Sequence, residues 1–204
     1  AYGGKIYLSI KNIKSIINGD SSNEYEITIQ NHWGTHIDAP NHFFSHGKKV
    51  IDYPPDFWVF NHPKVIDVTI KENEILNTID FNLVDNDTDL LLLRSGWSKR
   101  RDEDAYCIAN PGIDPNIAMA LRKNLPELRA VGIDWISVSS FKNRELGRMA
   151  HRNFLNPDGP NNPILIIEDM DLPDNLEGLQ YVIVIPLRFE GIDSSPCTVI
   201  AILK

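Results

Sequence analysis

The residues best suited to chemistry lie in one short segment, which reads HWGTHIDAPNH from position 32 to position 42. It places His32, His36 and Asp38 close together in the chain, with His42 just beyond them. Neutral imidazole and carboxylate groups are ligands of divalent ions such as Zn²⁺ and Mn²⁺. The segment therefore predicts a metal site with His32, His36 and Asp38 as its ligands.

The spacing of these ligands constrains the local backbone. A strand places all three on one side, because its side chains alternate. In a straight strand, His32 and Asp38 would still lie roughly 20 Å apart at about 3.3 Å per residue, too far for bonds of about 2 Å to one ion. Gly34 permits a bulge or a sharp turn, so we expect the strand to break at Gly34 and Thr35. The other side of this strand predicts a core face, formed by Ile27, Ile29, Trp33, Ile37 and Ala39.

The chemistry expected of such a site is hydrolysis. A divalent ion lowers the pKa of a bound water from 15.7 toward about 7 and polarises a carbonyl group, which favours attack by metal-bound water. His42 is the candidate general base and acid, since imidazole titrates near neutral pH. The helical zinc-protease motif is excluded, because Trp33 stands where that motif has Glu. His46 and His62 are expected on the surface.

Composition limits the class of protein. The 204 residues are 42% hydrophobic and 24% charged, which suits a single domain spanning residues 1–204. The net charge of -8 argues against a nucleic-acid partner. No apolar run predicts a signal peptide or a membrane span, so we expect a cytoplasmic enzyme with a small-molecule substrate. Cys107 and Cys197 are expected to be reduced core thiols.

Short runs rich in Ile and Val predict many strands and few helices. The expected strands cover residues 5–9, 24–37, 64–69, 90–94, 130–133, 164–167, 181–186 and 197–203. Residues 114–123 and 145–155 predict helices, and residues 171–178 a short third helix. This pattern is typical of a sheet-rich α/β or α+β domain.

The segment from His32 to His42 resembles the signature of the cyclase-like metal hydrolase family, which includes bacterial kynurenine formamidases and isatin hydrolases. Every fixed position of the pattern His-x-Gly-Thr-His-x-Asp-x-Pro-x-His is matched. The resemblance continues over nearly the whole chain, through residues 93–97, 111–113, 131–134, 137–138, 150–155, 166–168, 186–188, 191–193 and 195–196. Three departures stand out: Ser139 occupies a position where the family pattern has Asp, the loop between His151 and Glu168 is longer than usual, and the region between Leu8 and Glu24 lacks the usual Pro- and Gly-rich stretch.

The resemblance implies a swivelling β/β/α domain, a mixed sheet flanked by helices with a smaller sheet. It also implies that Asp38 bridges the first metal to a second one held by His151 and Glu168. The cofactor would thus be Zn or Mn, with one or two ions per chain, and the protein would be a homodimer.

By resemblance, the substrate is an amide, above all an aryl formamide such as N-formylkynurenine. Phe43 and Trp97 are the aromatic residues expected to contact it. Three alternatives stay open: hydrolysis of a cyclic amide or lactone such as isatin, a cyclase or dehydratase reaction, and a non-catalytic metal-binding protein on the same fold.

Overall fold

The computed structural model describes residue 2 and residues 8–204. Its strands are β1 (Ser9–Lys14), β2 (Glu24–Thr28), β3 (His36–Asp38), β4 (Val59–Phe60), β5 (Pro63–Asp67), β6 (Ile75–Leu76), β7 (Leu90–Arg94), β8 (Gly112–Ile113), β9 (Ala130–Ile133), β10 (Leu165–Glu168), β11 (Leu179–Pro186) and β12 (Ser194–Leu203). Its α-helices are α1 (Asp104–Ile108), α2 (Pro115–Asn124) and α3 (Arg144–Leu155).

One mixed sheet organises the domain. Its eight strands within the described residues follow the order β4-β11-β12-β3-β10-β9-β7-β5. Strands β10, β9, β7 and β5 run parallel, while β3, β12, β11 and β4 are joined by antiparallel pairing. Strand β11 also approaches β5, so the sheet curls toward a barrel. The predicted α/β class, a mixed sheet flanked by helices with smaller sheets, is confirmed.

The two faces of this sheet bury different sets of side chains. Helices α2 and α3 cover one face over β5, β7, β9 and β10, where Ile166 of β10 packs with Leu121 and Phe154. On the other face the curled sheet closes on itself, and Ile37 of β3 packs with Phe60 and Val184. Strand β3 therefore has one apolar side, which is buried where the sheet closes on itself. Its other side lies on the same face of the sheet as α2 and α3.

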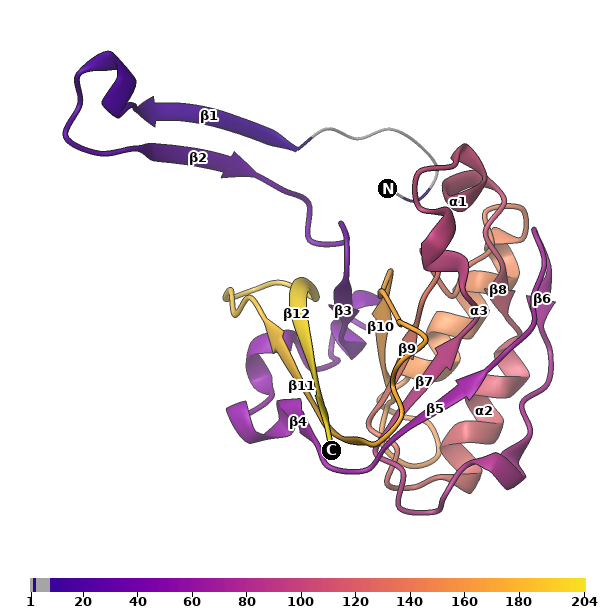
Figure 1. Cartoon of the computed structure of the whole chain (residues 1–204). Helices are drawn as coiled ribbons and strands as arrows, with labels where there is room; N and C mark the ends of the chain where they lie inside the picture. Colours follow the sequence, from indigo (N-terminus) through magenta and orange to yellow (C-terminus); the bar gives the residue numbers. More distant parts are fainter. Residues whose placement is uncertain (1, 3–7) are drawn as a thin grey trace.

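Strands β1 and β2 form a hairpin arm, residues 8–30, that projects away from the sheet (Figure 1). The arm corrects one expectation: Ile27 and Ile29 are 61% and 46% exposed instead of lying in the core. Ile37 and Ala39, predicted on the same side, are fully buried. The alternation of apolar residues was identified correctly. The chain turns after Gln30, however, so Ile27 and Ile29 lie on the arm, where the rest of the domain does not cover them.

Most of the predicted elements are present. Residues 90–94 and 130–133 match β7 and β9, and the predicted helices match α2 and α3 within one residue at either end. Asp114 caps α2, because its side chain accepts a hydrogen bond from the Asn116 backbone. A proline follows it at the first helical position, as predicted. The strand predicted at residues 5–9 lies mostly outside the described residues.

The third helix, predicted at residues 171–178, is wrong. This segment is irregular and ends at Gly178 with φ of 74°. Pro173 offers no backbone N–H for a helical turn, and its carbonyl instead accepts a hydrogen bond from Arg94. Among the described residues, no helix is long and apolar enough to cross a membrane.

Candidate metal centre

Strand β3 presents two candidate ligands on one face of the sheet. His36 and Asp38 alternate with Ile37, so both point away from the core that buries Ile37. The register places Glu168 of β10 directly opposite His36. All three side chains are almost completely buried, which collects two carboxylates and an imidazole in a space of low polarity.

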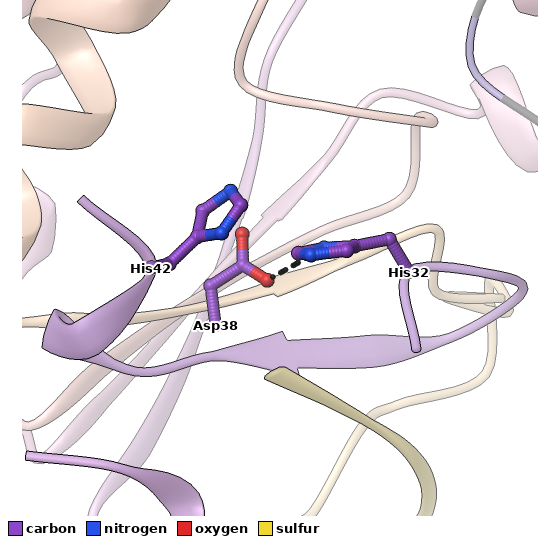
Figure 2. A group of neighbouring side chains, drawn as sticks. All are labelled: His32, Asp38 and His42. Carbon is purple, nitrogen blue, oxygen red and sulfur yellow. Dashed lines mark ion pairs between the residues drawn. The ribbon is translucent and has the colours of Figure 1, made fainter. Parts of the chain in front are cut away.

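A backbone turn brings His32 back over β3. Gly34 has φ of 65°, a conformation that glycine adopts without steric cost, and strand pairing stops between β2 and β3. The predicted break at Gly34 and Thr35 is therefore confirmed. As a result, His32 Nδ1 lies 3.2 Å from Asp38 Oδ1, and Figure 2 shows the His32 ring pointing at the Asp38 carboxylate.

His42 approaches the same carboxylate from the opposite end of β3, on the same face as His32 (Figure 2). It ends the short 3₁₀ turn Pro40–His42 that follows the strand. Its Nδ1 lies 2.6 Å from Asp193 Oδ2. A carboxylate only accepts at neutral pH, so Nδ1 donates this hydrogen bond, and in the neutral imidazole Nε2 is then the acceptor.

Helix α3 supplies His151 from the layer above the sheet. The His151 Nδ1 donates to the Gly147 carbonyl at 2.9 Å, which aims Nε2 at Glu168 Oε1, 3.3 Å away. A Cβ on Gly147 would lie 2.1 Å from Ser139 Oγ, so glycine allows this turn of α3 to approach the strand-end loop. Ser139, placed where the family pattern has Asp, lies 3.3 Å from His151 Nδ1.

Glu168 is held by groups that fix one of its oxygens. Its Oε1 accepts hydrogen bonds from Ser137 Oγ at 3.0 Å and from the Val138 backbone at 2.8 Å. The next residue, Asp169, has its backbone carbonyl bound by Thr35 Oγ1 at 2.7 Å. Thr35 therefore ties the segment that carries His36 to the segment that carries Glu168.

The residues present fit a divalent ion. Two ligands on one tetrahedral ion, each at about 2.1 Å, are about 3.4 Å apart. The facing atoms of His32, His36, His151, Asp38 and Glu168 are separated by 3.2 to 3.7 Å. Both Asp38 oxygens and His36 Nε2 are buried and, within the described chain, make no hydrogen bond of good geometry. Such orphaned acceptors are costly unless an ion satisfies them.

Within the described residues, two triplets of ligand atoms converge closely enough for an ion, and they share Asp38. One joins His32, Asp38 and His42, and the other joins His36, Asp38 and Glu168. The sequence had grouped His36 with His32, and Glu168 with His151. His36 Nε2 lies at similar distances from Asp38 and Glu168, 3.6 and 3.5 Å, so it can serve either side of the bridging carboxylate.

Charge coupling within the cluster shifts its pKa values strongly. Burial lowers the pKa of His32, but the neighbouring carboxylates of Asp193 and Asp38 outweigh it and raise the pKa to about 10. Burial also opposes the charged forms of His36 and His151, whose pKa values are nevertheless raised by the nearby Glu168 carboxylate. The pKa of Glu168 is lowered in return, because these two histidines outweigh its desolvation.

The structure separates the two aromatic residues predicted to contact substrate. Phe43 lies in the cluster, stacked on His151 with ring centroids 5.1 Å apart. Trp97 does not: it is 4% exposed in the hydrophobic core and donates its indole N–H to the Ile70 carbonyl. This packing covers the ring of Trp97 and argues against its contact with substrate. His46 and His62 are exposed as predicted.

Sequence reasoning gave no role to Asp193 or Ser194, although both touch the cluster. Asp193 binds His42 and lies 3.6 Å from His32 Nε2, and Ser194 Oγ lies 3.2 Å from His32 Nδ1. The sequence signal that could have pointed to Asp193 is its position directly after Gly191 and Ile192. Only the pairing of β12 with β3 brings this residue to the histidines.

The chain is similar to known proteins over most of its length. A family described as "Putative cyclase" matches residues 6–140. The kynurenine formamidase of Geobacillus thermodenitrificans (strain NG80-2) is 33% identical over 86% of this chain and 78% of its own length. That of Bacillus mycoides (strain KBAB4) is 32% identical over 88% of this chain and 79% of its own length.

Solved structures share the fold. Isatin hydrolase A from Labrenzia aggregata, bound to benzyl benzoate, superposes with a TM-score of 0.80 at 21% identity, covering 98% of this chain and 84% of that one. A "predicted metal-dependent hydrolase from Bacillus stearothermophilus" gives a TM-score of 0.72 at 24% identity, covering 98% and 93%.

Proposed function

Because the chain belongs to the cyclase family and is a metal-dependent amide hydrolase, we propose that its substrate is an aryl formamide such as N-formylkynurenine. The observation that carries this proposal is the buried Asp38 carboxylate, flanked by three histidines and by Glu168. The names of its curated relatives support the formamide.

We assign two ions to the cluster, Zn or Mn. His32, His36 and Asp38 would hold the first, and Asp38, His151 and Glu168 the second. When bound, such an ion polarises a carbonyl group and makes a water more acidic. The backbone carbonyls of Gly34 and Gly147 fix the tautomers of His36 and His151 through Nδ1, which leaves each Nε2 free to ligate.

His42 is assigned the proton transfers. With Nδ1–H donated to Asp193, its Nε2 can accept a proton from the attacking water as the water oxygen bonds to the formyl carbon. The same Nε2 then returns that proton to the leaving nitrogen as the carbon–nitrogen bond breaks. Formic acid and an aryl amine result, the acid loses its remaining proton to solvent as formate, and His42 regains its starting state.

Phe43 is the side chain placed to contact an aryl group. It packs edge-on against His42, with ring centroids 4.8 Å apart, and is only partly buried. An aromatic substrate that stacks on the Phe43 ring would bring the reacting group of the substrate toward the histidines. A small-molecule substrate, a homodimeric state and a cytoplasmic location stay predictions from the sequence.

The proposal is tested by presenting N-formylkynurenine and isatin to protein loaded with Zn²⁺ or Mn²⁺. We expect formamide hydrolysis that is absent from a His36→Ala variant. Turnover of isatin alone would transfer the assignment to ring amides. Firm metal binding with turnover of neither would reject the aryl formamide and favour a non-catalytic metal protein.

A further inference from the structure

A cavity of about 390 Å³, the Tyr53 cavity, lies apart from the candidate metal ligands, none of which lines it. Tyr53, Phe57 and four prolines form much of its wall. Leu165 of β10 also lines it and packs in the core that buries Ile37, whereas Glu168 of the same strand points to the opposite face of the sheet. The volume of the cavity is in the range of pockets that bind small molecules.

One wall of the Tyr53 cavity is the loop between α3 and β10, which contributes Asn162 and the prolines on either side of it. This is the loop whose length departs from the pattern of the family that the sequence resembles. Arg122, which is 1% exposed, holds the loop in place. Its guanidinium donates to the Pro160 carbonyl at 3.0 Å and to the Asn161 carbonyl at 2.9 Å. The longer loop is therefore an ordered wall of the cavity.

A second wall, which carries Tyr53 and Phe57, is also fixed by arginine side chains. Arg188 donates to the Tyr53 carbonyl at 2.8 Å. Arg129 donates to the Phe57 carbonyl, and its guanidinium lies 5.1 Å from the centre of the Phe57 ring. Asp89 balances the charge of Arg129 at 2.8 Å. Because both walls are held without a ligand, the cavity is formed in advance, which lowers the entropic cost of binding.

Three polar side chains on the cavity have no partner in the part of the chain that the structure describes. Tyr53 is 6% exposed, yet its hydroxyl makes no hydrogen bond there. Lys48 forms no salt bridge with a described residue, and its Nζ lies 5.3 Å from the centre of the Tyr53 ring. The amide of Asn162 also makes no hydrogen bond within the described residues. A nearly buried hydroxyl without a partner is costly unless a ligand satisfies it.

The charges around the cavity select an anion. Burial, and then the nearby Asp52 carboxylate, raise the pKa of Tyr53, so its hydroxyl keeps its proton and donates at neutral pH. The Lys48 ammonium and the Asn162 amide are donors as well. No carboxylate lines the cavity, although the whole chain has a net charge of -8. A cationic ligand would find no acidic partner there, whereas an anion would find several donors.

We propose that the Tyr53 cavity is a binding site for a small aromatic carboxylate. The carboxylate accepts hydrogen bonds from Lys48 Nζ and from the Tyr53 hydroxyl. The ring packs on Phe57 and on the prolines, which offer flat apolar surfaces. This site shares no residue with the metal cluster and does not depend on the identity of the substrate hydrolysed there.

The test is calorimetric titration of the full-length, metal-loaded protein with phenylacetate. We expect saturable binding with a Kd of about 1 mM or tighter. Tyr53→Phe, which removes only the hydroxyl, should weaken binding about 10-fold, and Lys48→Met about 2- to 5-fold. The matched controls are Tyr25→Phe and Lys123→Met, both at exposed positions, and they should bind as wild type does. The Tm of Tyr53→Phe should equal that of wild type, because its hydroxyl has no partner in the free protein.

Two further measurements identify the ligand class and the site. Phenylacetamide keeps the ring without the charge and acetate keeps the charge without the ring, so both should bind about 5-fold more weakly or less tightly still. Protein stripped of metal by a chelator should bind phenylacetate as tightly as loaded protein. The proposal would be overturned by an absence of saturable binding, by wild-type affinity in Tyr53→Phe, by equal affinity for phenylacetamide, or by binding that disappears with the metal. No formamide is present in these titrations, so failure of the formamide proposal would leave this site standing.

Discussion

His42 Nδ1 and Asp193 Oδ2 lie 2.6 Å apart, although 151 residues separate them in the chain. The pairing joins the turn after β3 to the residue before β12. It fixes the tautomer of His42 and orients its ring toward Asp38 (Figure 2). A histidine held in this way has a defined acceptor nitrogen, which a general base requires.

Asp193→Asn should lower kcat about 10²–10⁴-fold, the usual contribution of a positioned acid–base group. The amide keeps the shape of the side chain but can donate to His42 and reverse its tautomer. Metal content should stay close to that of wild type. Asp158→Asn is the matched control, because Asp158 pairs with the exposed His46 at 3.0 Å. Equal kcat in both variants would remove Asp193 from the proton transfers.

His36→Ala should release most of the bound metal, since His36 Nε2 faces both Asp38 and Glu168. Elemental analysis of the purified protein measures this directly. His46→Ala removes an exposed histidine from the same region and should retain a full complement. A His36→Ala protein that keeps all its metal would show that His36 is not a ligand.

Ser137→Ala should weaken metal binding about 10–100-fold, the range seen when a partner of a ligand is removed. Ser137 Oγ donates to Glu168 Oε1, and without it the carboxylate is held by the Val138 backbone alone on that oxygen. Competition with a chromogenic chelator gives the affinity. Ser45→Ala, at an exposed position, is the control. If Ser137→Ala bound metal as tightly as this control, Glu168 would not need the hydrogen bond from Ser137.

Metal binding should release protons. The pKa of His32 is raised to about 10, so protein stripped of metal keeps this imidazole protonated at pH 7.5, whereas a ligand must be neutral. In the protein without metal, the charged form of His32 stabilises the folded state. This stabilisation is complete below about pH 6.5, the pKa of histidine in the unfolded chain, and is lost as the pH rises through about 10. Metal affinity should therefore increase with pH over this range. Titration calorimetry in two buffers of different ionisation enthalpy counts the protons, and identical heats would contradict the prediction.

The ligand segment was predictable because its constraints are local. In a straight strand His32 and Asp38 would lie too far apart to bind one ion, so the chain had to bend between them, and Gly34 was the residue able to supply the bend. The partners of these ligands were not predictable in the same way, since Asp193 reaches His42 only through the pairing of β12 with β3. The alternation through Ile27 and Ile29 identified an apolar face but contained no information about which surface covers it.

The burial of Trp97 was not predictable either, for a physical reason. An indole ring suits both a stacking site and a core, and a Gly-Trp sequence after a strand does not decide between them. In the structure Gly96 turns the chain with φ of 80°, and the ring of Trp97 lies in the hydrophobic core, where its N–H donates to the Ile70 carbonyl.

Substitutions at the two aromatic positions should therefore differ in kind. Trp97→Ala should lower the free energy of unfolding by about 3–5 kcal/mol, as expected for a large buried aromatic side chain. Phe43→Ala, at a partly buried position stacked on His151, should instead raise KM about 2–10-fold, equivalent to about 0.5–1.5 kcal/mol of lost aromatic contact. Urea unfolding and steady-state kinetics on both variants separate the two effects. A Trp97→Ala protein of wild-type stability but raised KM would return Trp97 to the substrate site, because only an uncovered ring could be removed without leaving a cavity.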